Sequence, residues 1–270
     1  MKRIIPFLLL IFPLFVASCG GGDDASVAPK NDSAARENET LTVSAAVSLK
    51  DAFNEIGALY RTRTGRAVNF NFGASGALQK QIETGAPVDV FASAAERQMN
   101  ELADRRLIDA ASRRDFARNA LVLIVPAASA ATLASFNDLK RPEVRKIAVG
   151  NPKTVPAGIY TQQIFDYMGL HGDLQAKLIL AEDVRQVLEY VARGEADAGV
   201  VYVSDARAAG EKVRVEANAP AEAHEPVRYP IAVVADSRRQ TAAREFVELV
   251  TSAEGQAILQ RYGFAPPSDK

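Results

Sequence analysis

The chain has 270 residues, with 32 Lys and Arg against 33 Asp and Glu, and 48% of its residues are hydrophobic. These values are ordinary for a globular domain and exclude a disordered chain, a collagen-like chain and a disulfide-rich mini-protein. The formal charge of −1 argues against a nucleic-acid partner, which calls for a basic face. The single Cys excludes an internal disulfide.

The first residues are typical of an exported protein. Lys2 and Arg3 precede an uncharged apolar run over residues 4–16, which is too short to span a membrane. Residues 1–18 are therefore predicted to be a signal peptide. The run ends in the letters VASC, which resemble a bacterial lipobox, so Cys19 is the predicted lipidation site. An ordinary signal peptide with an incidental Cys is the alternative.

The lipidated Cys and a flexible linker are predicted to occupy residues 19–40. This stretch is rich in Gly, Ser, Asp and Asn and has no apolar period, as expected of a chain that cannot pack a core. The prediction is a lipoprotein on the periplasmic or cell-surface side, attached to the membrane through its lipid anchor only.

From residue 41 onward, short apolar runs alternate with amphipathic stretches. This alternation predicts an α/β fold in which mostly parallel sheets are flanked by helices. The expected strands are 41–47, 67–72, 88–92, 120–125, 146–150, 198–203 and 229–234. The expected helices are 49–63, 77–83, 96–104, 159–168, 184–193, 242–251 and 253–261.

Ligands of such sheets sit at the carboxyl ends of strands, where helices begin. Five of these junctions offer neutral hydrogen-bond donors, namely residues 44–49, 72–77, 155–160, 181–184 and 200–205. A helix start presents unpaired N–H groups and the positive end of a dipole, and the hydroxyls of Ser48, Ser75 and Tyr202 add further donors. Singly, the serines fit plain helix N-caps and Tyr202 fits a core aromatic. Only the set of five favours an anion site.

These junctions lie in segments that resemble the periplasmic molybdate-binding proteins of ABC transporters. The matching segments are SAAVSLKDAF (44–53), FGASGALQKQIETGAPVDVFASA (72–94), AVGNPKTVPAGIY (148–160), AEDVR (181–185), AGVVYVSDA (198–206) and RYGF (261–264). The resemblance implies a two-lobed, type II Venus-flytrap fold that holds the oxyanion between its lobes. Lobe I would comprise residues 41–121 and 230–270, and lobe II residues 122–229.

The resemblance also implies which residues contact the ligand. Ser48 and Ser75 would donate from hydroxyl and backbone N–H, Tyr202 from its hydroxyl, and Ala157 and Val184 from backbone N–H alone. It implies an ABC permease in the inner membrane as partner, a monomer, and no cofactor beyond the ligand. One departure lies at residues 73–76, where the family often has a run of serines and this chain has a single one.

A site made only of donors suits molybdate, which is fully ionised and carries no proton to donate. No carboxylate occupies a predicted contact position, and Asp183 and Asp205 are interpreted as helix-start acids or loop anchors. Tungstate is nearly the same size, so the predicted ligand is molybdate or tungstate. A tungstate-specific protein, or one for another oxyanion such as sulfate, is the alternative.

A serine-dependent hydrolase is a remote alternative. The sequence around Ser75 lacks the G-x-S-x-G spacing because residue 77 is Ala. His171 and His224 lie in polar surroundings and are interpreted as surface residues. Metal-binding and nucleotide-binding motifs are missing from the sequence, so the prediction is a binding protein with no catalytic residue and no cation ligand.

Overall fold

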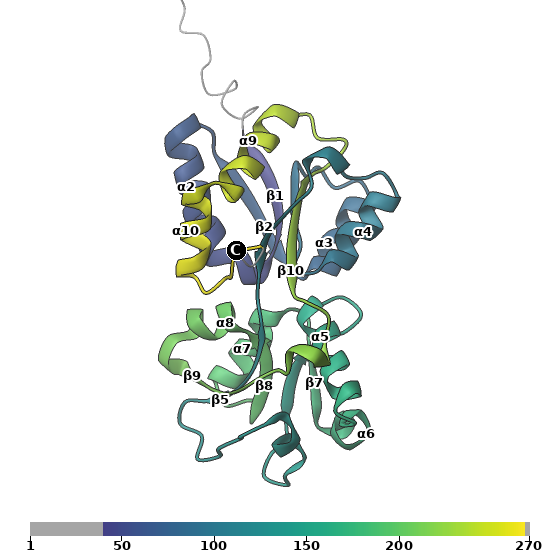
Figure 1. Ribbon diagram of the computed structural model, residues 1–270, viewed down its shortest axis with the longest axis vertical. Coiled ribbons are helices and arrows are strands. Elements are labelled where there is room, and N and C mark those ends of the chain that lie inside the picture. Colours follow the sequence, from purple (N-terminus) through teal and green to yellow (C-terminus); the bar gives the residue numbers. More distant parts are fainter. Residues whose placement is uncertain (1–39, 268–270) are drawn as a thin grey trace, which may run out of the picture.

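The computed structural model describes residues 40–267. Two lobes lie one above the other along the long axis of the molecule (Figure 1). Each lobe holds, within those residues, a five-stranded sheet with helices against it, in the strand orders β2-β1-β3-β10-β4 and β7-β6-β8-β5-β9. This is the expected two-lobed α/β architecture. The signal peptide predicted over residues 1–18, the Cys19 lipidation site and the linker predicted over residues 19–40 lie outside the described residues, except for residue 40.

The strands of the first sheet come from both ends of the described chain. They are β1 (Leu41–Ala46), β2 (Val68–Gly73), β3 (Val90–Ala92), β4 (Arg114–Arg118) and β10 (Arg228–Val233). Helices around this sheet are α2 (Lys50–Thr64), α3 (Ser75–Glu83), α4 (Glu96–Asp104), α9 (Gln240–Thr251) and α10 (Ala253–Arg261).

The second sheet is built from the middle of the chain. Its strands are β5 (Leu121–Pro126), β6 (Ile147–Gly150), β7 (Leu178–Ala181), β8 (Ala198–Tyr202) and β9 (Val213–Asn218). The helices of this lobe are α5 (Pro156–Tyr167), α6 (His171–Leu174), α7 (Val184–Ala192) and α8 (Val203–Ala209).

Both sheets are mixed, which corrects the expectation of mostly parallel strands. β1 runs parallel to β2 and β3, and β6 runs parallel to β7 and β8. β10 is antiparallel to β3 and β4, and β5 is antiparallel to β8 and β9. β5 and β10 are the strands by which the chain enters a lobe from the other one. They therefore run opposite to strands that follow a βα crossover inside a lobe.

The chain passes between the lobes in two segments, one between β4 and β5 and one just before β10, and a hydrogen bond joins them. The N–H of Asn119, between β4 and β5, donates to the carbonyl of Val227, just before β10, at 3.1 Å. Arg118 also pairs with Ala265 near the end of the described chain. The two crossing segments are thus bonded to each other, and the first of them is also bonded to the end of the described chain.

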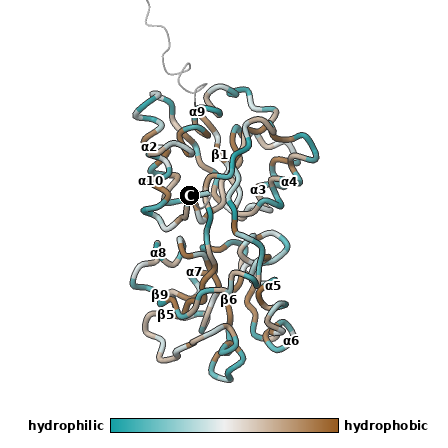
Figure 2. Tube along the Cα trace, viewed as in Figure 1, coloured by the Kyte–Doolittle hydropathy of each residue, from teal (hydrophilic) through white to brown (hydrophobic). Residues whose placement is uncertain are grey.

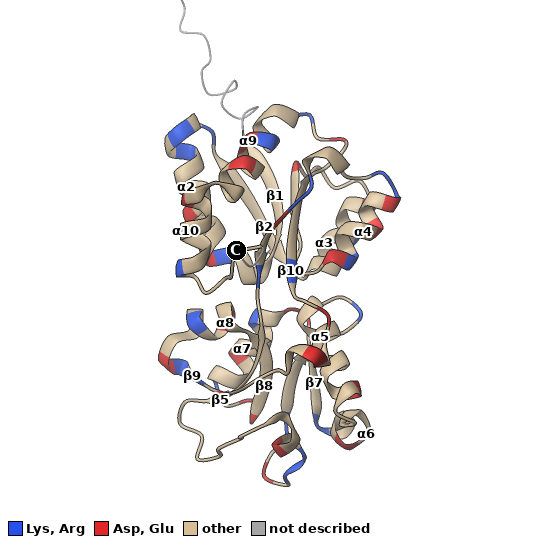
Figure 3. Cartoon of the chain, in the orientation of Figure 1, with Lys and Arg blue, Asp and Glu red and all other residues tan. Residues whose placement is uncertain are grey.

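Apolar side chains of the strands form the cores. All five residues over 121–125 in β5 are buried, as are Leu41, Val43 and Ala45 of β1. In Figure 2 the strands inside each lobe are the brown, hydrophobic parts of the trace, and the outer loops are teal. Basic and acidic side chains are interspersed over both lobes (Figure 3). Among the described residues no helix is both long and apolar enough to cross a membrane.

Helix starts and ends follow local chemistry. Pro156 begins α5, where its missing N–H is not needed. Asp183 caps α7 by accepting from the N–H of Gln186 at 2.9 Å, as its interpretation as a helix-start acid predicts. Gly65 ends α2 with a left-handed φ of 76° that a glycine adopts without strain.

The strands β4, β7 and β9 are absent from the elements expected from sequence. In β4 only two of the five letters RDFAR are apolar, and its first residues belong to a charged run over 113–115 that is typical of a solvated face. β7 and β9 are edge strands of their sheet and carry exposed apolar residues, Leu180 and Val215. Edge strands need no continuous apolar run, so their sequence signal is weak.

Candidate oxyanion-binding site

The five residues predicted from sequence occupy equivalent places in the two lobes. Each lies at or just after the carboxyl end of a strand: Ser48 after β1, Ser75 at the start of α3 after β2, Ala157 in the first turn of α5, Val184 at the start of α7 and Tyr202 at the end of β8. All five are closed off from solvent, with exposed fractions of 3%, 0%, 0%, 4% and 1%. The lobes therefore cover these positions.

Two contacts join the segments near these residues across the lobe boundary. The rings of Tyr229 in β10 and Tyr202 in β8 meet edge to face with centroids 5.9 Å apart. The N–H of Gly76, next to Ser75, donates to the carbonyl of Thr154 of the other lobe at 3.0 Å. Within the first lobe, the hydroxyl oxygens of Ser48 and Tyr229 are 3.1 Å apart.

The two serines do not cap helices, which corrects the N-cap expected at Ser48. Ser48 lies inside a 3-10 turn over Val47–Leu49, and the N-cap of α2 is Leu49. Ser75 is the first residue of α3, whose N-cap is Ala74 with no side-chain bond. The Oγ of Ser75 accepts instead from the N–H of Ala94, after β3, at 3.0 Å. Neither serine oxygen is therefore used as an acceptor that caps its helix.

The hydroxyl of Tyr202 is buried and has no hydrogen-bond partner within the described residues. Burying a polar group without a partner is unfavourable by about 1–3 kcal/mol, so native structures seldom do it without a functional reason. Burial, followed by the nearby hydroxyls of Tyr229 and Tyr160, raises the pKa of Tyr202 well above its usual value. Tyr202 therefore keeps its hydroxyl hydrogen at neutral pH and is a neutral donor without an acceptor among the described residues.

Backbone N–H groups complete the donor set. Ala157 is the second residue of α5 and Val184 the first of α7, and a helix supplies no carbonyl to the N–H groups of its first turn. The first turn of α5 lies very close to the end of β6. A Cβ at Gly158 would be 2.0 Å from the carbonyl oxygen of Gly150, the last residue of β6. Only glycine lets α5 start this close to the sheet.

Arg185 is a site residue that the sequence reasoning missed. It follows Val184 on α7, and its guanidinium reaches Asp205 in the same lobe and Asp51 of α2 in the other, each at 2.7 Å. Burial disfavours the charge of Arg185, but the carboxylates of Asp205 and Asp51 more than compensate and raise its pKa. The letters AEDVR gave no signal for this contact, because Asp51 is 134 residues away in the chain.

Asp205 is fully buried but serves as an anchor and not as a ligand. Its carboxylate accepts from Nε of Arg185 at 2.7 Å and from the N–H of Tyr202 at 3.4 Å. Burial raises the pKa of Asp205 to about 6, and Arg185 opposes that rise. Both acids beside the predicted contacts, Asp183 and Asp205, thus have structural partners.

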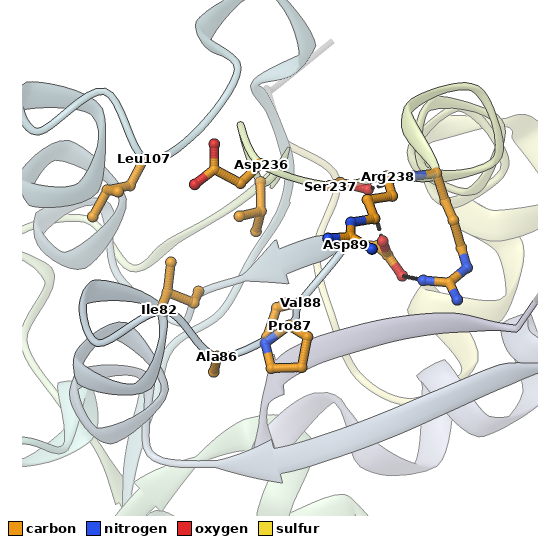
Figure 4. Close-up of a pocket in the computed structure, with 12 residues that line it drawn as sticks. Ile82, Ala86, Pro87, Val88, Asp89, Leu107, Asp236, Ser237 and Arg238 are labelled. Carbon is orange, nitrogen blue, oxygen red and sulfur yellow. Dashed lines mark hydrogen bonds and ion pairs between the residues drawn. The ribbon is translucent and has the colours of Figure 1, made fainter. Parts of the chain in front are cut away.

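A cavity of the first lobe that is lined by charged residues lies elsewhere (Figure 4). It measures about 270 Å³ and is lined by the loop before β3 and the loop after β10, with Asp89 among its residues. Asp89 accepts from the N–H of Thr42 at 2.8 Å and the hydroxyl of Ser237 at 2.7 Å, and it pairs with Arg239. This cavity is at the amino end of β3, opposite the end used by ligands in such sheets.

The described residues offer no cluster of three or more His, Cys, Asp and Glu side chains suited to a metal ion. His171 is exposed, and the ring of His224 lies tilted against that of Tyr160 with centroids 5.8 Å apart. The hydroxyl of Ser75 is bonded to a backbone N–H and not to an imidazole. The structure thus joins two lobes by crossing segments and buries neutral donor groups near the carboxyl ends of their strands.

Comparison with known proteins identifies the family. Residues 41–265 match the bacterial extracellular solute-binding protein family, and the chain belongs to it. It is 38% identical to YvgL of Bacillus subtilis, whose name describes an ABC transporter substrate-binding lipoprotein, over 93% of both chains. It is also 38% identical to the molybdate-binding protein ModA of Escherichia coli, over 83% of this chain and 88% of that one.

Solved structures agree with this assignment. The periplasmic molybdate-binding protein of Azotobacter vinelandii superposes with a TM-score of 0.76 at 26% identity, covering 84% of this chain and all of that one. The sulfate-binding protein SubI of Mycobacterium tuberculosis shares the fold, with a TM-score of 0.72 at 17% identity over 84% of this chain and 86% of that one. The chain is thus an extracytoplasmic solute-binding protein, and its relatives are binding proteins and not enzymes.

Proposed function

We propose that this protein captures molybdate, and also tungstate, between its lobes and delivers the anion to an ABC permease. The observation that carries the proposal is the buried, unpartnered hydroxyl of Tyr202 beside two buried serines whose hydroxyls cap no helix. These groups, with the N–H groups of Ala157 and Val184, make a set of donors without a carboxylate facing it. Such a set suits a dianion that carries no proton.

Relatives support the ligand class. The names of several proteins that are 33–38% identical to this chain over most of its length state that they bind molybdate. Tungstate has the same charge and shape and nearly the same size, so the same donors serve it. Sulfate is smaller, and donors placed around the larger anion reach it less well.

The proposal also covers how the protein is organised. Residues 41–121 with 230–270 form one binding lobe and residues 122–229 the other, and ligand closes them on the hinge. Cys19, after removal of residues 1–18, carries the lipid that holds a monomer at the membrane through the linker 19–40. Acyl labelling of the wild type against Cys19→Ala tests the anchor, since labelling retained in the variant contradicts it.

Calorimetric titration of the domain from residue 40 with molybdate, tungstate, sulfate and phosphate tests the ligand. Molybdate and tungstate are expected to bind most tightly. Ser48→Ala and Ser75→Ala should each weaken molybdate binding by about 1.5–3 kcal/mol, because each removes a hydrogen bond to a charged group. Ser237→Ala, which changes a buried serine at the other end of the first lobe, is the control. Phosphate binding without molybdate binding, or full affinity in both serine variants, contradicts the proposal.

A further inference from the structure

We infer that Asn119 and Tyr229 are positioning residues that fix the direction of the Ser48 hydroxyl, so that it donates to the oxyanion and does not accept from it. The inference rests on the proposed function, because it takes Ser48 as a ligand contact. Asn119 and Tyr229 lie on the two segments that connect the lobes, outside the five predicted contacts.

The side-chain amide of Asn119 has one favourable orientation. Its Oδ1 accepts from the backbone N–H of Ala120 at 3.0 Å, and its Nδ2 lies 2.8 Å from the Oγ of Ser204 and 3.3 Å from the Oη of Tyr229. A backbone N–H can only donate, so turning the amide over would place two donors against each other. Asn119 therefore presents donors to Ser204 and to Tyr229.

This donor sets the direction at Tyr229. A phenol has one hydrogen, and its oxygen already accepts from Nδ2 of Asn119. Two hydroxyls remain near the Tyr229 oxygen, those of Ser48 and Tyr202. Only the Oγ of Ser48, at 3.1 Å, makes a hydrogen bond with it among the described residues, so the phenol hydrogen goes there. Tyr229 is fully buried, and burial raises its pKa above the usual value, so the phenol keeps this hydrogen at neutral pH.

Ser48 then accepts from Tyr229 and has its own hydrogen left to donate. In the reverse direction Ser48 would donate to Tyr229 and present only lone pairs to the ligand. Lone pairs repel a fully ionised anion and attract one that carries a proton. Ser75 has the same arrangement by a shorter route, since its Oγ accepts from the N–H of Ala94 at 3.0 Å. Both serines are thus set as donors by fixed donors behind them.

A double-mutant cycle on molybdate affinity tests whether Tyr229 acts through Ser48. Tyr229→Phe removes the hydroxyl and keeps the ring, which packs edge to face on Phe116, Tyr202 and Phe264. We expect Tyr229→Phe to weaken molybdate binding about three- to tenfold in the wild type, the value of one neutral hydrogen bond. In the Ser48→Ala background the same change should cause no further loss. An equal loss in both backgrounds indicates a packing role and overturns the inference, as does no loss in the wild type.

Selectivity gives a second measurement that packing does not affect. At mildly alkaline pH, sulfate and hydrogen phosphate are tetrahedral dianions of similar size, but only hydrogen phosphate carries a proton. Competition against bound molybdate should show the sulfate-to-phosphate preference falling in Tyr229→Phe, because a freed Ser48 hydroxyl can turn and accept. An unchanged preference overturns the inference.

Asn119→Ala provides an independent route if Tyr229→Phe fails to fold, since it removes the donor that sets the direction and leaves Tyr229 intact. It is expected to lower both molybdate affinity and the sulfate-to-phosphate preference, and to lose its effect in the Ser48→Ala background. If Ser48→Ala itself leaves affinity unchanged, or the wild type binds no molybdate, it is the proposed function that fails. If Ser48→Ala weakens binding but the effects of the two substitutions simply add in the double variant, only the inference about Asn119 and Tyr229 fails.

Discussion

Removing the hydroxyl of Tyr202 should change stability and affinity in opposite directions. The hydroxyl is buried without a partner, so Tyr202→Phe deletes a group whose burial is unfavourable by about 1–3 kcal/mol. The variant without ligand should therefore be at least as stable as the wild type, and more stable by up to that amount when the lobes are closed. The ring contact with Tyr229 remains in the variant.

The same change should weaken ligand binding strongly. In the proposed complex the hydroxyl donates to a dianion, and a hydrogen bond to a charged group contributes about 1.5–3 kcal/mol. Molybdate affinity is then expected to fall about ten- to a hundredfold. Calorimetric titration measures the affinity, and denaturant unfolding without ligand measures the stability.

Tyr60→Phe is the matched control. Tyr60 is as deeply buried as Tyr202, but its hydroxyl donates to the carbonyl of Ala242 at 3.0 Å. This variant should lose about 0.5–1.5 kcal/mol of unfolding free energy and keep its molybdate affinity. If Tyr202→Phe behaves like Tyr60→Phe, with lower stability and full affinity, then Tyr202 is an ordinary core residue and the reasoning is refuted.

Three further predictions concern charge and packing near the site. Asp51→Asn breaks the half-exposed ion pair with Arg185 across the lobes, so molybdate affinity should fall about two- to fivefold at low salt. Glu143→Gln breaks the ion pair with Arg141 within one lobe and should leave the affinity unchanged. Burial raises the pKa of Asp205 to about 6 from 3.8, so protonation of Asp205 favours the folded state fully below pH 3.8, and this contribution is lost as the pH rises through 6. The unfolding free energy of the wild type should therefore fall by about 3 kcal/mol relative to that of Asp205→Asn between about pH 4 and 7. Equal pH dependence of the two unfolding free energies would contradict this. Gly158→Ala should lower the melting temperature and molybdate affinity together, because its Cβ would overlap the last carbonyl of β6, and a variant as stable as wild type would count against this.

The sequence predicts the parts of this fold that depend on local pattern. Apolar runs such as 121–125 and the amphipathic stretch 184–193 become β5 and α7, because periodicity reports which face of an element is buried. Strand direction is different, since the βα alternation suggests parallel neighbours and contains nothing about a strand that arrives from the other lobe. For that reason the antiparallel placement of β5 and β10 could not be predicted.

The site follows the same division. The sequence alone shows small and hydroxyl residues at the ends of the expected strands. All five predicted contacts are buried at or after the carboxyl ends of strands. The exact cap is not visible, because a 3-10 turn before α2 moves the helix start past Ser48. The hydrogen-bond partners of side chains could not be predicted from the sequence either. Ser48 and Tyr229 are 181 residues apart in the chain, and only the tertiary structure brings their hydroxyls together.

The placement of Arg185 explains how a site next to a guanidinium can bind through neutral donors. Its two ends are occupied by Asp51 and Asp205 at 2.7 Å, so its charge is directed at carboxylates and not at the enclosed volume. A free guanidinium would attract any anion, protonated or not, because charge attraction depends little on where protons lie. Hydroxyls and N–H groups of fixed direction act only when the ligand oxygen is a lone-pair acceptor at the right distance. In the proposed site, discrimination among dianions of equal charge is therefore assigned to Ser48, Ser75 and Tyr202, while Arg185 joins the two lobes through its pairs with Asp51 and Asp205.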